Sequence, residues 1–268
     1  SKYENLYHVE TPSENSDVYS ERLANIIAAA CRQTGKQVVV LIDEYDAPML
    51  DVAHEDKQLD ILRNIMRNFY SPLKKCESLL RFVFLTGITK FSQLSIFSEL
   101  NNLDNISLFD QYSAICGISK TELTTAMKPD VEGLGRALGL TYEQCLEELR
   151  QYYDGYHFSE HAEDVFNPFS LINALADSDL KNYWASSGAT SLLPKFVDNI
   201  EMRMKDFENC PIDSDTLETS DVTGGGAELF LYQSGYLTIK GYMDGIYLLG
   251  IPNYEVRKAL YKIVLPAL

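Results

Sequence analysis

The sequence has few of the features that cross-link a chain or anchor it in a membrane. It contains five cysteines, and no two of them form a C-x-x-C pair. An odd number of widely spaced cysteines is typical of reduced thiols and argues against a disulfide framework or a zinc site. No apolar run approaches the roughly 20 residues that span a bilayer, and no apolar signal region follows Ser1. We therefore expect a cytoplasmic protein without a membrane partner.

Positive charge is also scarce in this sequence. The 268 residues include 23 Lys and Arg against 39 Asp and Glu, which gives a formal net charge of −16. A surface this acidic repels a phosphate backbone, so direct binding of nucleic acid is disfavoured. With 46% hydrophobic residues and no long low-complexity run, the chain is expected to fold around a buried core.

The sequence contains no phosphate-binding loop of the pattern G-x-x-x-x-G-K-[ST], known as Walker A. In that loop, backbone amides and a lysine hold the phosphates, and a helix follows directly. The nearest approach is Thr34-Gly35-Lys36-Gln37, which lacks a first glycine at the required spacing and precedes an apolar strand pattern. We interpret this segment as the end of a helix followed by a turn.

The strongest chemical signal is an acidic strand end. Val38 to Ile42 is a run of five apolar, mostly β-branched residues, which is typical of a strand buried on both faces of a parallel sheet. Asp43, Glu44 and Asp46 follow it, and ligands in open α/β sheets bind beyond the carboxyl ends of the strands. We interpret the segment as a Walker B motif. The alternative is a strand that simply leaves the core and meets solvent.

Each carboxylate of this motif has a physical role in a nucleotide hydrolase. Asp43 would hold a nucleotide-bound Mg²⁺ through water, because this ion prefers oxygen ligands and keeps several waters. Glu44 would orient or deprotonate the attacking water. Asp46 would support the metal shell or fix the loop. The predicted cofactors are therefore Mg²⁺ and ATP, with Asp43 and Glu44 as the catalytic pair.

A second apolar strand pattern, residues 79–85, ends at Thr86-Gly87. In ATPases of this kind the neighbouring strand often ends in a small polar residue that senses the γ-phosphate. Thr86 is the candidate for that position, with Thr89 and Lys90 behind it. An equally good interpretation is a glycine-containing turn that leaves the strand, since threonine is common at strand ends.

The order of the expected elements predicts the fold class. Helix patterns at about 20–33 and 56–69 alternate with the two strands, and a short third strand is expected at 113–116. This alternation predicts an α/β domain in residues 1–118 that contains a partial P-loop NTPase parallel sheet.

Residues 119–268 are expected to be mainly helical. Capping boxes begin at Ser119 and Thr141, and Asn167-Pro168 gives a cap followed by proline. A loop at 216–226, strands at 229–240 and 246–251 with a tight turn between them, and a closing helix at 254–265 are also expected. Helices followed by such a hairpin are typical of a winged-helix-like module.

Several segments together resemble a bacterial family called AAA-ATPase-like. Their combination is specific and extends over nearly the whole chain. The segments are residues 34–48, 84–92, 97–103, 153–159, 167–170, 183–188, 233–240 and 250–257.

The resemblance implies a P-loop ATPase of the signalling, STAND-like kind, in which Asp43 and Glu44 match Walker B and Thr86 matches the sensor position. The family places its P-loop before the segment seen in this chain, and a PD-(D/E)XK nuclease-like domain often follows. The resemblance therefore predicts that the parent protein binds and hydrolyses ATP as a regulatory switch, whereas this piece is inactive alone.

Two other functions remain open from the sequence. The chain could be a non-catalytic scaffold that binds partners through its helical, winged-helix-like region. It could also belong to a DNA-associated regulator that works through the hairpin near Lys240, although the net charge of −16 disfavours that function.

Overall fold

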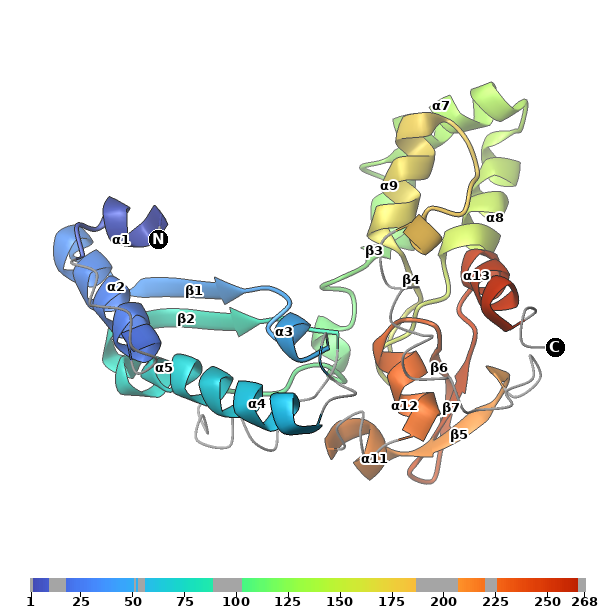
Figure 1. Cartoon of the computed structure of the whole chain (residues 1–268). Helices are drawn as coiled ribbons and strands as arrows, with labels where there is room; N and C mark the ends of the chain where they lie inside the picture. Colours follow the sequence, from blue (N-terminus) through green and yellow to red (C-terminus); the bar gives the residue numbers. More distant parts are fainter. Residues whose placement is uncertain are drawn as a thin grey trace. The chain divides into compact units, whose positions relative to one another are not determined.

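The computed structural model describes residues 2–9, 18–50, 52, 56–88, 103–186, 207–219 and 226–264. The chain divides into two compact units (Figure 1). Unit 1 comprises residues 1–104 with 219–224, and unit 2 comprises residues 105–218 with 225–268. The fold is mixed α/β, with small sheets and many helices. The predicted domains, 1–118 and 119–268, stay predictions.

The described part of unit 1 contains helices around a short parallel sheet. The predicted helices near 20–33 and 56–69 are confirmed, as are both strands. The elements are α1 (Lys2–Leu6), α2 (Val18–Thr34), β1 (Val38–Ile42), α3 (Ala47–Leu50), α4 (Asp56–Tyr70), α5 (Pro72–Lys75), η1 (Glu77–Leu79) and β2 (Leu80–Leu85).

The sheet of unit 1 joins β1 and β2 in parallel, with Leu41 opposite Phe84 and Ile42 opposite Leu85. Parallel strands end at the same edge of a sheet. The loops that follow β1 and β2 therefore begin side by side, which is the feature that positions the candidate site.

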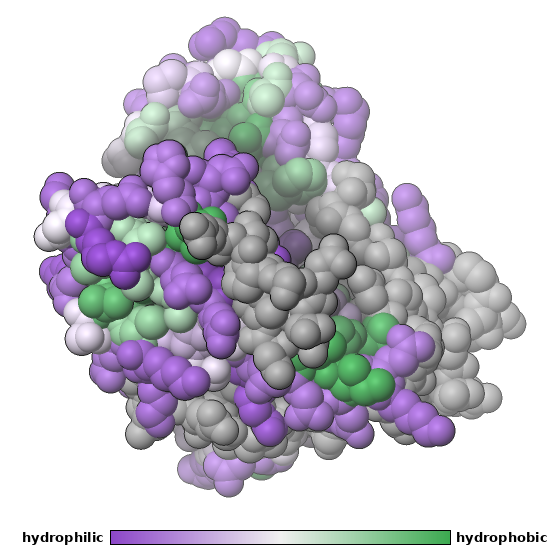
Figure 2. Space-filling model, turned by 60° about the vertical axis from the view of Figure 1, so that its left-hand side comes forward, coloured by the Kyte–Doolittle hydropathy of each residue, from purple (hydrophilic) through white to green (hydrophobic). Residues whose placement is uncertain are grey.

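One expectation for β1 is wrong in this structure. The strand is not buried on both faces, because Val39 is 53% exposed and Leu41 is 69% exposed, and Phe82 on β2 is 54% exposed. Side chains alternate across a strand, and α2 packs against β1, so one face of the sheet is covered better than the other. Elsewhere too, hydrophobic residues form separate patches on a largely hydrophilic surface (Figure 2).

Unit 2 begins with helices and continues into a three-stranded sheet. Its elements are η2 (Asp110–Tyr112), β3 (Ile118–Ser119), α6 (Lys120–Thr124), α7 (Lys128–Leu138), α8 (Tyr142–Tyr153), β4 (Val165–Phe166), α9 (Pro168–Asp177), η3 (Trp184–Ser186), β5 (Cys210–Asp213), α11 (Ser214–Thr219), α12 (Gly226–Gln233), β6 (Thr238–Met243), β7 (Ile246–Gly250) and α13 (Tyr254–Val264).

The capping signals of unit 2 are confirmed. Ser119 and Thr141 each form a capping box, at the starts of α6 and α8. The Asn167 side chain accepts the Ser170 N–H at the start of α9. These helices enclose one core. It is formed by Leu123, Val131, Leu134, Cys145, Leu149, Tyr153, Phe166, Leu171 and Ala174.

The second part of unit 2 is built on an antiparallel sheet in the order β5-β7-β6. The predicted hairpin is confirmed between β6 and β7. Asp244 and Gly245 both have positive φ, 50° and 84°, which is the conformation of a two-residue type I′ turn. The helices α11 and α12 lie between β5 and β6 along the chain.

Three local expectations for unit 2 are wrong. Residues 113–116 form turns closed by local hydrogen bonds, and the short strand β3 comes later, at Ile118–Ser119. The start of the expected strand 229–240 belongs to α12, because a short apolar run fits a buried helix as well as a strand. The expected loop 216–226 begins in α11, where the Asp213 carboxylate accepts the Thr216 N–H at 2.8 Å and caps the helix.

Candidate functional site

The candidate site lies where the loops after β1 and β2 meet. The backbone ladder continues past the strands, since the Thr86 N–H donates to the Ile42 carbonyl at 2.9 Å and the Tyr45 N–H donates to the Thr86 carbonyl at 3.0 Å. The Thr86 hydroxyl also donates to Oδ1 of Asp43. The structure thus brings Asp43, Glu44 and Thr86 together at one edge of the sheet.

Asp43 is held in place by one of its two carboxylate oxygens. Oδ1 accepts the Thr86 hydroxyl and also the Glu44 N–H, the latter at 3.0 Å. Among the described residues, no hydrogen bond uses Oδ2, and both Asp43 and Glu44 are exposed. Glu44 has a φ of 51°, a left-handed conformation that costs a non-glycine residue about 1 kcal/mol. The result is a held Asp43 carboxylate beside an exposed Glu44.

Asp46 occupies a different environment from Asp43. It is 0% exposed, its Oδ1 accepts the Ile88 N–H at 3.2 Å, and its carbonyl accepts the N–H groups of Met49 and Leu50. Burial, and then the charge of Asp46, raise the pKa of Tyr70 to about 12. Asp46 therefore ties the first loop to the second.

Lys90, the remaining predicted site residue, lies outside the described residues, as does Thr89.

Gly87 allows the two loops to approach closely, whereas the sequence pattern predicts only a turn at this position. A Cβ atom at this position would lie 2.6 Å from Cε1 of Tyr45 and 2.7 Å from Oδ1 of Asp46. Real Cβ atoms do not make such contacts, so only glycine fits without movement of the loop. The sequence signal was the Thr86-Gly87 pair at the end of a strand.

The residues fit one kind of cation better than others. Across the described ranges, no group of three or more His, Cys, Asp or Glu could hold a metal ion. A single fixed carboxylate with a free oxygen suits an ion that keeps most of its waters and takes its remaining ligands from nucleotide phosphates. Asp43 would therefore suit an Mg²⁺ ion that is held mainly by a nucleotide and by water.

A second group of polar residues holds unit 2 together. Nζ of Lys240 donates to the carbonyls of Gly155 and Pro252 at 3.0 and 3.4 Å, and Nδ2 of Asn253 donates to the Asp154 carbonyl at 3.0 Å. Gly155 has a φ of 91°, and a Cβ there would lie 2.3 Å from the Pro252 oxygen. The contacts of Gly155 with Lys240 and of Asp154 with Asn253 join segments 85 and 99 residues apart, so these residues stabilise the fold of unit 2.

Comparison with known proteins shows a family similarity in the part of the chain that contains the candidate site. Residues 1–97 match the model of the AAA-ATPase-like family, which is described as a predicted AAA-ATPase. The candidate site at Asp43, Glu44 and Thr86 lies inside the matched AAA-ATPase-like segment.

A curated relative is similar along most of the chain. It is an "Uncharacterized protein in vnfD 5'region" from Azotobacter chroococcum mcd 1, and it is 33% identical over 249 residues, which cover 91% of this chain. This chain spans about half of that relative, 46% of its length. No solved structure gives a significant match. The described part of the chain contains no helix with the length and apolar content to cross a bilayer.

Proposed function

We propose that the AAA-ATPase-like segment supplies the magnesium-holding and water-activating part of an ATP-hydrolysing switch, and that a P-loop elsewhere in the parent protein completes the site. One observation carries the proposal. Asp43 and Glu44 follow β1, Thr86 follows the neighbouring parallel strand β2, and the Thr86 hydroxyl donates to Asp43. Ligands of open α/β sheets bind at this edge.

Each side chain has a defined part in this proposal. The Glu44 N–H and the Thr86 hydroxyl orient Asp43, which leaves Oδ2 to accept from a water of the bound ion. The Mg²⁺ ion bound with the nucleotide would supply the positive charge that offsets the charge developing on the phosphates. Glu44 faces solvent beside Asp43 and accepts a proton from, or orients, the attacking water. Asp46 keeps the two loops in register through Ile88.

The exposed face of the sheet supports the idea that more of the parent protein packs on it. Val39, Leu41 and Phe82 leave apolar side chains exposed on the strands of the site. Parallel sheets are normally covered on both faces, and a two-stranded sheet is marginally stable by itself. A further part of the parent protein would cover this apolar face.

The test uses the full-length parent protein. Glu44→Gln should slow ATP hydrolysis by about 10²-fold or more, because it removes the group that activates water, while Mg·ATP binding measured by calorimetry stays close to wild type. Glu77→Gln is the matched control, since it removes an exposed carboxylate of the same unit outside the site. Hydrolysis by the Glu44→Gln variant at the wild-type rate would refute the proposal.

A second function is favoured by a separate observation. The strand order β5-β7-β6, with α11 and α12 between β5 and β6, is typical of winged-helix modules. The helix α12 carries Glu228 and no Lys or Arg, so a protein-binding scaffold suits it better than a DNA-binding module. Fluorescence anisotropy with labelled duplex DNA at low salt should show no binding. Micromolar binding would instead favour the DNA-associated regulator.

A further inference from the structure

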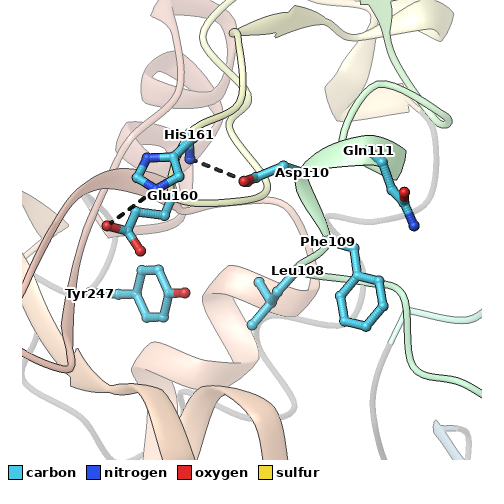
Figure 3. Close-up of a pocket in the computed structure, with 7 residues that line it drawn as sticks. All are labelled: Leu108, Phe109, Asp110, Gln111, Glu160, His161 and Tyr247. Carbon is cyan, nitrogen blue, oxygen red and sulfur yellow. Dashed lines mark hydrogen bonds and ion pairs between the residues drawn. The ribbon is translucent and has the colours of Figure 1, made fainter.

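Unit 2 contains a hollow of about 540 Å³ that the ATPase proposal does not use. Three parts of the chain form it: the segment around η2, the loop before β4, and the strand β7. Glu160 and Tyr247 lie on one side of the hollow, and Leu108 and Phe109 lie across from them (Figure 3). Among the described residues, none that lines the hollow is Lys or Arg.

Two carboxylates give the hollow its charge. Oδ1 of Asp110 accepts the His161 N–H at 3.3 Å. The nearby Ser159 side chain and then this N–H hold the pKa of Asp110 below its usual range. Oε1 of Glu160 lies 3.7 Å from Nε2 of His161. The side chain of Asp110 is thus fixed by the loop that also carries Glu160.

Aromatic and aliphatic side chains form the walls and continue onto the surface beside the hollow. Phe109 is 49% exposed, and its ring stacks on Tyr112 with centroids 6.5 Å apart. The Tyr247 ring contacts Tyr242 with centroids 4.8 Å apart. Tyr242 lies opposite Tyr247 on the same face of the hairpin, and it is 40% exposed. Apolar surface therefore extends from the hollow to the hairpin.

We propose that this hollow binds an arginine side chain from a peptide segment of a partner protein. A guanidinium is planar, pairs with carboxylates through several N–H groups and stacks on aromatic rings. Asp110 and Glu160 provide the carboxylates, and Phe109 and Tyr247 provide the rings. The net charge of −16 attracts a basic partner. The exposed Tyr242 ring of the hairpin offers a surface for the residues that flank the arginine, which a free amino acid would not use.

The experiment measures binding of a labelled short peptide to the 268-residue chain by fluorescence anisotropy. The probe is an acetylated, amidated peptide with one arginine between two leucines. The comparison peptide carries citrulline, which keeps the shape and removes the charge. The arginine peptide should bind about tenfold more tightly than the citrulline peptide, and its affinity should fall with added salt.

Substitutions in the hollow distinguish binding at a specific site from general attraction of the peptide to an acidic surface. Glu160→Gln and Phe109→Leu should each lower the affinity for the arginine peptide by about three- to tenfold. Glu163→Gln removes an exposed carboxylate of the same loop that does not line the hollow, and it should leave the affinity unchanged. Thermal unfolding checks that each variant is folded.

Three results would overturn the proposal. Equal affinity for the arginine and citrulline peptides would show that charge is not recognised. An equal loss in Glu160→Gln and Glu163→Gln would show diffuse attraction to an acidic surface. Equal affinity for free arginine amide and the peptide would show that the hairpin surface plays no part. Because the hollow lies in unit 2, none of these outcomes bears on the ATPase proposal.

Discussion

At the scale of single residues, Gly87 has the tightest surroundings in the candidate site. A Cβ at Gly87 would lie within 3 Å of Tyr45 and Asp46. We expect Gly87→Ala to destabilise unit 1 by about 1–3 kcal/mol, because the added carbon forces the two loops apart. Urea unfolding measures the change. Gly133→Ala is the control, since a Cβ there meets only Arg136 at 3.8 Å, and it should be neutral or stabilising. Equal stability of both variants would contradict the geometry.

Glu255 is the buried acid whose titration should affect stability. It is 1% exposed, and its Oε1 accepts the N–H groups of Tyr183 and Trp184 at 2.5 and 2.8 Å. Burial raises the pKa of Glu255 above its ordinary value of 4.5, and the N–H donors oppose this only in part. The folded state therefore binds the proton more tightly than the unfolded chain does.

The free energy of unfolding should consequently fall as the pH rises from the ordinary pKa of Glu255 through its raised folded pKa. Glu255→Gln keeps an oxygen acceptor and removes the titration. As the pH rises, the free energy of unfolding of the variant should increase relative to that of the wild type. The increase should be roughly 1.4 kcal/mol for each unit of difference between the folded and unfolded pKa of Glu255. Urea unfolding between about pH 5 and 8 measures this. Glu163→Gln should follow the wild-type profile, and a Glu255→Gln profile parallel to it would refute the prediction.

At the scale of elements, capping decides how well α8 is defined. The Thr141 hydroxyl accepts the Gln144 N–H at 3.2 Å, and the Gln144 side chain accepts the Thr141 N–H at 2.9 Å. The same helix places Cys145, Leu149 and Tyr153 in the core of unit 2. The start of this helix is therefore fixed by side chains that the sequence alone identifies.

Thr141→Ala should lower the free energy of unfolding of unit 2 by about 1 kcal/mol, because it leaves the Gln144 N–H without its side-chain acceptor. Chemical denaturation followed by far-UV circular dichroism measures the shift. Thr124→Ala is the control, since its hydroxyl bonds only to carbonyls of its own helix, and it should change stability by less than about 0.5 kcal/mol. An equally large loss of unfolding free energy in Thr124→Ala would contradict a specific role for the Thr141 cap.

At the scale of the whole molecule, charge and the missing phosphate loop act together. The chain carries a net charge of −16 and no Walker A pattern. Asp43 and Glu44 alone repel ATP, and no amide nest or lysine of that pattern offsets the repulsion. We expect this 268-residue chain to bind Mg·ATP weakly or not at all, and to release phosphate no faster than a blank. Calorimetric titration beside the parent protein checks this. Micromolar binding by the chain would reveal another nucleotide site.

The local elements of this protein follow directly from its sequence. The strands at Val38–Ile42 and after Leu79, the capping boxes at Ser119 and Thr141, and the Asp244-Gly245 turn are all where the patterns predict them. Each depends on residues a few positions apart, whose geometry is set by backbone sterics and short-range hydrogen bonds.

Other features depend on contacts that no local pattern encodes. The apolar run at 229–231 is helical and buried in α12. Its composition suits a strand equally, so the local sequence does not decide between the two. Leu41 is exposed because α2 packs on the other face of the sheet. Its hydrophobic side chain alone would predict burial. The closeness of Gly87 to Asp46, and of Asp110 to His161, joins residues 41 and 51 positions apart.

The sequence by itself determined the chemistry of the acidic strand end and the short-range structure on which it stands. Only the tertiary structure decided that Thr86 bonds to Asp43, that Asp46 is buried while Asp43 is exposed, and that Asp110 and Glu160 share a hollow with Tyr247. The physical reason is that burial and long-range pairing are properties of the whole packed unit. A residue type sets what a side chain can do, and its neighbours in space set whether it is charged, held or open to a ligand.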